Sequence, residues 1–405
     1  MTELSFLTAP GMSAGFIAET RPRAHGAGID PYEYDRVTAP IDSLLQWPDA
    51  CRAAALDHRA RAERAAERGR VRTAGQHHRL AARWFHLAAL LPDPDRERAA
   101  AVAAEADRSM GAALALLEPR ARRIAGEGYA GWLRLPQPPD AVRASDAAGG
   151  RFPLVVLVPG MDSSKEEFHG PADALLARGV AVLAVDGPGQ GVLATGPALG
   201  PDHRHAIGRA LDHALAVAAE LPAMPSAGPS AGLSAGPGAG AGAGAEAVGA
   251  AEAVVPAGGV IDPGRIAVLG LSLGGYLAAA VAAHDPRVRA AALVSGPYRL
   301  DWDGVVPFVT ATLARRCGDA SAARAFVEQL DLAALAPRLR GLPVLLVEGG
   351  ADRIPGVTNA DALTADLPDV ELLHVPYGNH LLGNALPDWL PDLADWLAET
   401  LEARA

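Results

Sequence analysis

The pattern G-x-S-x-G occurs four times in this sequence, around Ser13, Ser230, Ser234 and Ser272. A serine in this pattern can attack a carbonyl carbon when a sharp turn between a buried strand and a helix presents its hydroxyl. The turn crowds the backbone against its neighbours, which explains the small residues two positions before and after the serine. The segments around each copy therefore decide which serine could act as a nucleophile.

Ser272 alone of the four has those neighbours. The apolar run RIAVLG at 265–270 precedes it and is typical of a buried strand, while LGGYLAAAVAAH at 273–284 follows and is typical of a helix. The segment before Ser13 contains Pro10, which is disfavoured in a central strand. We therefore predict that Ser272 is the nucleophile; the alternative is a tight strand-to-helix turn without a catalytic role.

Ser230 and Ser234 lie in a stretch at 222–259 that consists almost entirely of Ala, Gly, Pro and Ser. Such a composition buries too little apolar surface to offset the conformational entropy that is lost on ordering. We predict that this stretch is a flexible insertion in a surface connection, and that its two serines are linker residues.

A catalytic serine needs a base that takes its proton and an acid that orients the base. In chains with this turn, the acid and then the histidine follow the serine, each in a loop after a strand. Asp352 follows the strand-like PVLLVEGG at 343–350, and His380 follows VELLHVP at 370–376. The order and placement predict that both act with Ser272 in a catalytic triad.

The predicted acid and base each have a rival. Glu348 and His374 could take their places, but both lie inside strand-like runs rather than in the loops after them. His380 is also one of 12 histidines in the chain, so the alternative for it is an ordinary polar loop residue.

The oxyanion that forms during acyl transfer needs backbone N–H donors that already point at it. One donor would be the amide of Leu273, directly after the nucleophile, and we assign the other to Met161 in the loop PGMDSSKEE at 159–167. The same loop could also cap a helix through a capping box, with Ser163 and Glu166 or with Ser164 and Glu167.

The apolar segments predict an α/β fold in two parts. Apolar residues recur at three and four positions through the first 120 residues, which indicates helices, and 122–136 indicates a short pair of strands. Further on, unbroken apolar runs alternate with helix-like segments, which predicts a mostly parallel, doubly wound sheet. We expect a helical domain over 1–120 and a catalytic domain over 121–405. The further strands are predicted at 152–160, 180–191, 265–270, 289–296, 343–350 and 370–376.

The composition narrows the function classes. A net charge of −11 argues against nucleic acid as a partner. Cys51 and Cys317 offer no disulfide framework, which favours a cytoplasmic location, and the N-terminus lacks the pattern of a signal peptide. No long apolar stretch predicts a membrane span. Because neither metal-ligand spacing nor a dinucleotide-binding fingerprint occurs, we expect a small-molecule substrate and no cofactor or metal.

Four segments together resemble one group of known enzymes: PGMDSSKEE, DGPGQG, GLSLGGYLAAA and YGNH. Over roughly residues 70–400, without the insertion, they are similar to the FrsA-like esterases and to the 2,6-dihydroxypseudooxynicotine hydrolase branch of the α/β-hydrolases. The resemblance implies the α/β-hydrolase fold and cleavage of an ester or of a carbon–carbon bond beside a ketone. It also implies a substrate cleft between the helical domain and the sheet, and a homodimer through the helical domain.

That branch has an additional glutamate after the strand that follows the nucleophile. Here the segment GPYRLDWDG offers Asp301 and Asp303 instead, and each side chain is one methylene shorter than glutamate. Two carboxylates in a pocket can act as general acid and base, so the pair is a candidate auxiliary acid. The alternative is a solvated turn.

Three functions remain after these arguments. We favour a serine hydrolase that acts on a small ester, thioester or β-dicarbonyl substrate. A peptidase of the prolyl-oligopeptidase type shares the order of triad residues, but such enzymes normally carry a propeller domain, and no blade repeats occur in the sequence. A catalytically silent binding protein on the same fold is the third possibility, although the complete set of triad residues argues against it.

Overall fold

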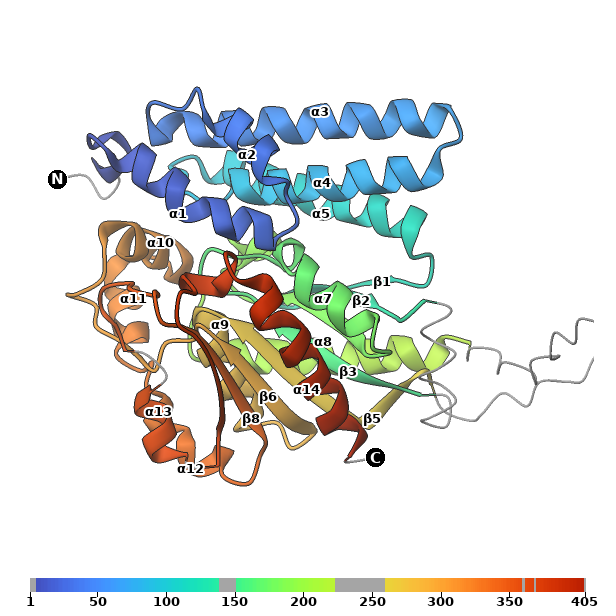
Figure 1. Ribbon diagram of the computed structural model, residues 1–405, viewed down its shortest axis with the longest axis vertical. Helices are drawn as coiled ribbons and strands as arrows, with labels where there is room; N and C mark the ends of the chain where they lie inside the picture. Colours follow the sequence, from blue (N-terminus) through green and yellow to red (C-terminus); the bar gives the residue numbers. More distant parts are fainter. Residues whose placement is uncertain (1–4, 138–150, 223–258, 359–360, 368, 404–405) are drawn as a thin grey trace, which may run out of the picture.

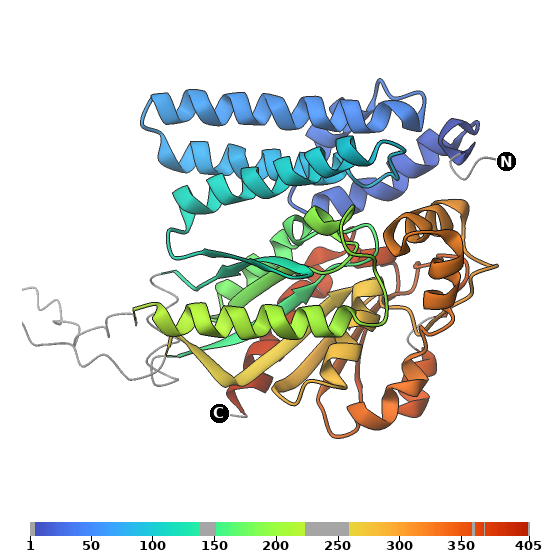
Figure 2. The ribbon, with the colours of Figure 1, turned by 180° about the vertical axis from the view of Figure 1, so that it is seen from behind.

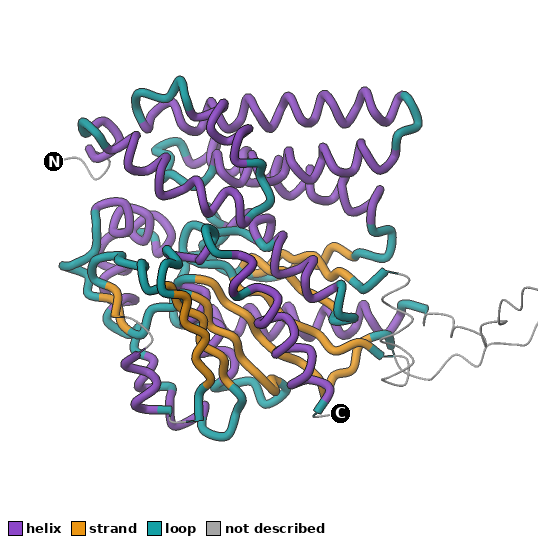
Figure 3. The backbone as a smooth tube through the Cα atoms, viewed as in Figure 1, coloured by secondary structure: helices purple, strands orange, loops and turns teal. Residues whose placement is uncertain are grey.

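The computed structural model describes residues 5–137, 151–222, 259–358, 361–367 and 369–403. The N-terminal part of the chain forms a layer of helices along one side of the molecule, and the sheet lies beneath it (Figure 1). The tube in Figure 3 shows the change from helices to strands along the chain. The α-helices of this N-terminal helical region are α1 (Met12–Gly26), α2 (Pro31–Thr38), α3 (Trp47–Glu67), α4 (Val71–Ala88) and α5 (Arg96–Leu117).

Aromatic side chains fill the core of the helical region. Trp47 of α3 and Trp84 and Phe85 of α4 are fully buried in one cluster. The Trp47 Nε1–H donates to the backbone oxygen of Leu87 at 2.7 Å, so this buried polar atom is satisfied. Asp95 caps the start of α5 by accepting two backbone amides of the first turn. The helices predicted for the first 120 residues are present.

Eight strands of the described residues form one sheet in the order β1-β2-β4-β3-β5-β6-β8-β10. The strands from β4 to β10 pair in parallel, whereas β1 with β2, and β2 with β4, pair antiparallel. The prediction of a mostly parallel sheet is confirmed, and the strand pair predicted at 122–136 forms its antiparallel edge. The strands are β1 (Arg122–Gly126), β2 (Tyr129–Arg134), β3 (Phe152–Val158), β4 (Ala181–Asp186), β5 (Ile261–Leu271), β6 (Val288–Val294), β8 (Val344–Gly349) and β10 (Glu371–Val375).

Both faces of the central strands β3 and β4 are buried, as their unbroken apolar runs predicted, whereas the edge strands β1 and β10 are largely exposed. Along β3, Leu154 and Val156 join one core, while Val155 and Leu157 join the core on the opposite face. Helices cover both faces, as Figure 1 and the reverse view in Figure 2 show. On the Leu154 face lie α8 (His203–Glu220) and α9 (Leu273–Ala282), and on the other face lie α7 (His169–Leu176) and α14 (Leu390–Glu402).

Several elements lie outside the sheet on the chain between β6 and β10. A two-stranded ribbon pairs β7 (Arg299–Leu300) with β9 (Val357–Thr358). The helices of this part are α10 (Pro307–Cys317), α11 (Ala320–Val327), α12 (Ala336–Leu339) and α13 (Asp361–Asp366). Figure 1 shows α10 beside α1, so the part of the chain between β6 and β10 contacts the helical region.

Two further sequence predictions concern the insertion at 222–259 and the absence of a membrane span. The predicted insertion at 222–259, with Ser230 and Ser234, lies outside the described residues except at its two ends. Among the helices that the structure describes, none combines the length and the apolar character needed to cross a membrane.

Candidate active site

The turn that carries Ser272 joins β5 directly to α9. Ser272 has φ 56° and ψ −130°, a conformation that costs free energy for a residue with a side chain. A Cβ atom on Gly270 would lie 1.9 Å from the backbone oxygen of Gly274, and one on Gly274 would lie 2.2 Å from that of Val158. Larger residues do not fit at either glycine. At Ser272 the G-x-S-x-G pattern is therefore a direct result of backbone crowding.

Ser272, His380 and Asp352 lie in hydrogen-bond contact in that order. His380 Nε2 is 2.9 Å from Ser272 Oγ, and His380 Nδ1 is 2.8 Å from Asp352 Oδ2. Because an ionised carboxylate only accepts, His380 carries its proton on Nδ1 and leaves Nε2 able to take the proton of the serine. The side chains of His380 and Asp352 are 22% and 11% exposed, so this base and acid are largely shielded from water.

Unusual backbone conformations gather at this place. In the described chain, the non-glycine residues with positive φ are Ser272, Ser295, Leu381 and Leu382. Ser295 follows β6, and its Oγ accepts the amide of Leu381 at 3.1 Å, which holds the segment directly after His380. Such conformations persist where the surrounding contacts enforce them, and they concentrate at functional sites.

The rival residues lie elsewhere. His374 on β10 and Glu348 on β8 are register partners on neighbouring strands, and His374 Nδ1 lies 2.9 Å from Glu348 Oε1. Ser13 lies in α1, where its hydroxyl donates to the backbone oxygen of Asp42 at 3.0 Å. The structure therefore brings together the three residues of the predicted triad and leaves the rivals in other contacts.

The loop after β3 approaches the Ser272 turn closely at Gly160. A Cβ atom on Gly160 would lie 3.2 Å from the backbone oxygen of Leu271 and 3.8 Å from the backbone nitrogen of Leu273. Met161 follows and is half-buried. The two amides predicted as oxyanion donors, those of Met161 and Leu273, thus belong to backbone segments that meet beside the serine.

A buried glutamine orients this loop. Gln190 is 0% exposed, and its Nε2 donates to the backbone oxygens of Pro159 at 2.5 Å and Gly160 at 3.1 Å. In a planar trans peptide, the C=O of one residue and the N–H of the next point in opposite directions. Gln190 therefore sets the direction of the Met161 N–H by holding the Gly160 oxygen.

His203 of α8 supports Gln190 in turn. Its Nε2 donates to Gln190 Oε1 at 2.9 Å, and its Nδ1 has no hydrogen-bond partner among the described residues. Burial lowers the pKa of His203 to about 3, because the charged ring would lose its hydration. The folded protein therefore contains this ring in its neutral form.

The neutral His203 ring predicts a pH dependence of stability. Its folded pKa of about 3 lies below the unfolded value near 6.5, so the unfolded chain binds the extra proton first as the pH falls. His203→Gln keeps a donor toward Gln190 but does not titrate. Below pH 6.5 the wild type should lose free energy of unfolding relative to this variant, by up to about 1.4 kcal/mol per pH unit.

Urea unfolding of both proteins between pH 8 and pH 5 measures this difference. The two curves of free energy against pH should run parallel above about pH 7 and separate below it. Curves that stay parallel over the whole range would show that His203 is not held neutral.

Arg23 of α1 ties the loop after Met161 to the helical region. Its guanidinium lies 2.6 Å from Asp162 and 2.5 Å from Glu167. Burial would raise the pKa of the Glu167 carboxyl, but Arg23 outweighs burial and holds this pKa well below its usual range. The loop beside Ser272 is therefore fixed by charges that come from the N-terminal helices.

The predicted capping box in this loop is wrong. Ser163 Oγ donates to the Glu167 carboxylate, and Ser164 Oγ lies 2.9 Å from His86 Nδ1 of α4. A short 3₁₀ turn follows, without a side-chain cap, and α7 begins only at His169. Ser163 therefore bonds a side chain of its own loop, and Ser164 bonds a histidine of the helical region, which a local sequence pattern does not indicate.

Lys165, the single lysine of the sequence, adds a second buried link. Its Nζ lies 2.8 Å from carboxylate oxygens of Glu166 and Asp186 and 3.1 Å from Asp107 of α5. Burial alone would lower the pKa of Lys165, but the three carboxylates outweigh it and raise this pKa. The loop is thus joined to α5 as well as to α1.

Asp301 and Asp303 lie on an exposed turn. Asp303 Oδ2 accepts from Arg324 at 2.8 Å, and its side chain is 71% exposed. The Asp301 amide donates to the backbone oxygen of Gly356 at 2.7 Å, which braces this turn against the segment after Asp352. Within the described residues, neither carboxylate has a hydrogen bond to the predicted triad. These contacts favour the solvated turn over the auxiliary acid.

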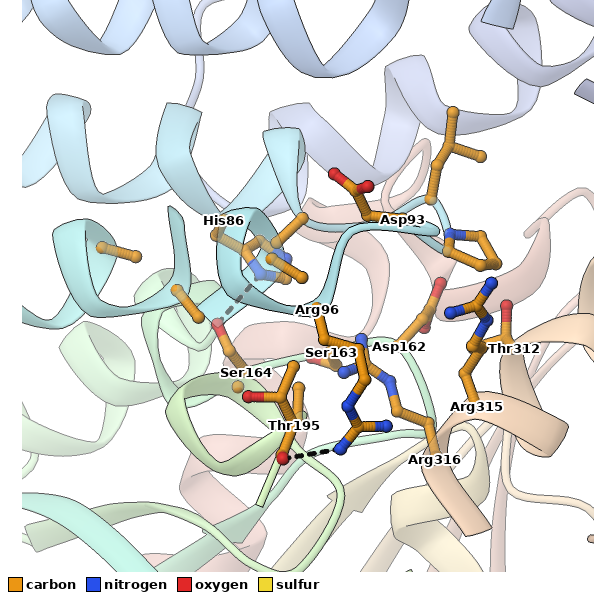
Figure 4. A pocket seen from close by; sticks show the side chains of 18 of the residues that line it. His86, Asp93, Arg96, Asp162, Ser163, Ser164, Thr195, Thr312, Arg315 and Arg316 are labelled. Carbon is orange, nitrogen blue, oxygen red and sulfur yellow. Dashed lines mark hydrogen bonds between the residues drawn. The ribbon is translucent and has the colours of Figure 1, made fainter. Parts of the chain in front are cut away.

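A pocket lies where the helical region meets the loop after Met161 (Figure 4). It encloses about 730 Å³, including space that is open to solvent. The predicted triad does not line it, but Asp162 in its wall is the neighbour of Met161. The polar residues that line it include Asp93, Arg96, Asp162, Thr312, Arg315 and Arg316.

This fold is that of a known class. A family model described as the prolyl oligopeptidase family matches residues 241–404, which contain Ser272, Asp352 and His380. The crystal structure of the 2,6-dihydroxy-pseudo-oxynicotine hydrolase is similar with a TM-score of 0.71 and 24% identity, over 94% of this chain and 96% of that one. A structure of AbyA5 is similar with a TM-score of 0.60 and 18% identity, over 92% and 94% of the two chains. The described chain therefore has the fold of these hydrolases, and its C-terminal part matches the prolyl oligopeptidase family model.

Relatives found by sequence are named as hydrolases. Hydrolase LUC6 from a Fusarium species is 33% identical over 179 residues, which are 43% of this chain and 32% of the relative. The 20-hydroxy-prefusarin hydrolase FUS2 from Gibberella moniliformis is 32% identical over 155 residues, which are 37% of this chain and 28% of the relative. The matched part thus spans about a third of the length of these relatives.

Proposed function

We propose that this protein is a serine hydrolase that cleaves a small ester, thioester or β-dicarbonyl substrate through an acyl-enzyme on Ser272. The observation that supports this proposal best is the continuous hydrogen-bonded chain from Ser272 Oγ through His380 to Asp352, with contacts of 2.9 and 2.8 Å. The names of the relatives, one of which is called a 20-hydroxy-prefusarin hydrolase, agree with hydrolysis.

The proposed reaction has two halves. In the first, Ser272 Oγ attacks the substrate carbonyl while His380 Nε2 takes its proton, and the oxyanion accepts the amides of Met161 and Leu273. His380 then returns the proton to the leaving group, and the acyl group remains on the serine. In the second half a water molecule repeats the attack with His380 as base, which releases the acid. For a β-dicarbonyl, the leaving group is an enolate that receives the same proton.

A fluorophosphonate probe tests this proposal. The probe phosphonylates an activated serine with loss of fluoride, so the purified protein should gain one adduct, and peptide mass spectrometry should locate it on Ser272. Labelled protein should have lost its activity on 4-nitrophenyl esters. An adduct on another serine would refute the assignment of Ser272, and a protein without any adduct or esterase activity would support the silent binding protein.

Gln190 provides a prediction about the proposed oxyanion donors. Gln190→Leu removes both hydrogen bonds that hold the Gly160 peptide, so the Met161 amide should lose its fixed direction. Loss of one oxyanion donor costs about 10²- to 10³-fold in kcat, and we expect a fall of about 10²-fold with little change in KM.

Steady-state kinetics on 4-nitrophenyl esters measures this effect, below the temperature at which the variant unfolds. The matched control is Gln329→Leu, at an exposed glutamine that bonds only its own helix turn. A Gln190→Leu enzyme with unchanged kcat, or with a change in KM alone, would contradict the proposed part played by Met161.

A peptidase is the second candidate, because the prolyl oligopeptidase family model matches the part of the chain that holds the triad residues. The described N-terminal region argues against it, since it is built from α-helices where that type of enzyme normally has a propeller. Hydrolysis of a proline 4-nitroanilide at a rate comparable to that of esters would favour the peptidase.

We propose further that the division into a helical domain and a catalytic domain near residue 120 is functional. In this proposal the substrate lies between the two, in the pocket beside the loop that contains Met161. Charges from α1 and α5 hold that loop, which supports the helical region as one wall of the substrate site.

A further inference from the structure

The pocket between the helical region and α10 is lined by as many arginines as carboxylates, but within the described residues none of these arginines forms an ion pair with those carboxylates. Three carboxylates line it, and each already has a cationic partner within the chain. Asp93 is 2.7 Å from Arg98, and Asp162 is 2.6 Å from Arg23. Glu166 is likewise 2.8 Å from the Lys165 Nζ. These acids are therefore engaged in existing ion pairs.

The arginines of the pocket differ from its acids in this respect. Arg96 donates to the backbone oxygen of Thr195 at 2.8 Å, an uncharged acceptor. Arg315 and Arg316, in the last turn of α10, are half-buried, and within the described chain neither guanidinium has a hydrogen bond or an ion pair. Figure 4 shows Arg96, Arg315 and Arg316 around the same pocket. Burial lowers the pKa of Arg316 although Asp162 and Asp186 attract its charge, so an anion within hydrogen-bond distance would recover free energy that burial costs.

A neutral donor lies beside them. Thr312 is one helix turn before Arg316 on α10 and lines the same pocket. Its side chain is 2% exposed, and its Oγ1 has no hydrogen-bond partner among the described residues. Buried hydroxyls are normally satisfied, so this atom independently indicates a missing acceptor.

We propose that this pocket binds a carboxylate of the substrate, with Arg315 and Arg316 as its counter-charges and Thr312 Oγ1 as an additional donor. The inference rests on the proposed function, because it assigns a class of substrate to the same site. The planar fork of an arginine matches the two oxygens of a carboxylate, which is the reason for choosing this anion. The substrate is then an ester, thioester or β-dicarbonyl with a free carboxylate at some distance from the reacting carbonyl.

Two matched esters test this proposal. One is the 4-nitrophenyl monoester of glutaric acid, and the other is the same compound with its carboxylate methylated. The wild type should have a kcat/KM about 10- to 100-fold higher for the anionic ester, since hydrogen bonds to charged groups have that effect. Arg316→Gln and Arg315→Gln should each lose most of this preference, because kcat/KM should fall much more for the anionic ester than for the neutral one. Arg289→Gln, at an exposed arginine on β6, is the matched control.

A ligand-binding measurement separates the outcomes. Glutarate should raise the melting temperature of the wild type and of Arg289→Gln, but not that of Arg316→Gln. Equal kcat/KM for the two esters, or an equal loss for both in the arginine variants, would overturn the carboxylate proposal and leave the hydrolase standing. Arginines that only stabilise the C-terminus of α10 would lower the melting temperature without changing the ester preference, which would also overturn it. A wild type that fails to label with fluorophosphonate and cleaves neither ester would instead refute the proposed function.

Discussion

Replacing Ser272 with alanine should lower kcat for ester hydrolysis by about 10⁶-fold, the loss typical of a missing triad serine. The variant retains His380 and Asp352 but has no atom that can form the acyl-enzyme. Its fold should persist, because alanine fits the space of serine and the crowded glycines on either side are unchanged. Release of 4-nitrophenol, followed over hours at high enzyme concentration, is sensitive enough to measure a loss of kcat of about 10⁶-fold.

The sequence contains a matched control for this experiment. Ser13 lies in the same G-x-S-x-G pattern but donates to a backbone oxygen within the helical region. Ser13→Ala should therefore keep wild-type kcat. An inactive Ser13→Ala protein, or a Ser272→Ala protein with half its activity, would show that the pattern was assigned to the wrong turn.

Asp352→Asn should lower kcat by about 10⁴-fold. The carboxylate accepts the proton on His380 Nδ1, and this contact keeps Nε2 free for the serine. An amide can offer its own N–H to His380, which favours the opposite tautomer and leaves the serine without a base. The side chain keeps its size, so the melting temperature should change little. Rates over a range of pH measure the loss.

Glu348→Gln is the control for this second prediction. Glu348 is the rival acid, and its only described side-chain partner is His374, at 2.9 Å. The variant should retain its activity within about twofold, as expected for a residue that does not act on the transition state. If Glu348→Gln were strongly inactivated and Asp352→Asn stayed active, Glu348 and not Asp352 would be the acid that orients His380.

The sequence was sufficient to predict the turn at Ser272 and its proximity to Asp352 and His380, because each depends on local context. An apolar run, a small-residue turn and an Ala-rich helix identify Ser272 within about 20 residues of chain. Asp352 and His380 follow from the rule that parallel strands end at one edge of the sheet. The same regularity explains why the strands and the helical region were predicted closely.

Contacts between distant segments could not be predicted in this way. Arg23 reaches Asp162 across 139 residues, and nothing near either residue indicates the other. The segment DGPGQG contributes to the family resemblance, but nothing in it predicts that its Gln190 holds a peptide beside Ser272. A polar residue such as Gln190 at the end of a glycine-rich turn can hold a neighbouring loop. Its partner here is a backbone oxygen, which every residue has, so the sequence does not indicate which residue it bonds.

Arg23 also couples the unfolding of the helical region to that of the sheet. If α1 detached first, Asp162 and Glu167 would remain as carboxylates in a region built around a guanidinium, and breaking such a buried pair costs roughly 3–5 kcal/mol. The same helix packs against the segment after His380, where a Cβ atom on Gly383 would lie 2.2 Å from the backbone oxygen of Pro22. The helices and the sheet should therefore melt as one cooperative unit. Deleting α1 to obtain a smaller protein would then remove the ion pairs that hold the loop beside Ser272, in addition to exposing that loop to solvent.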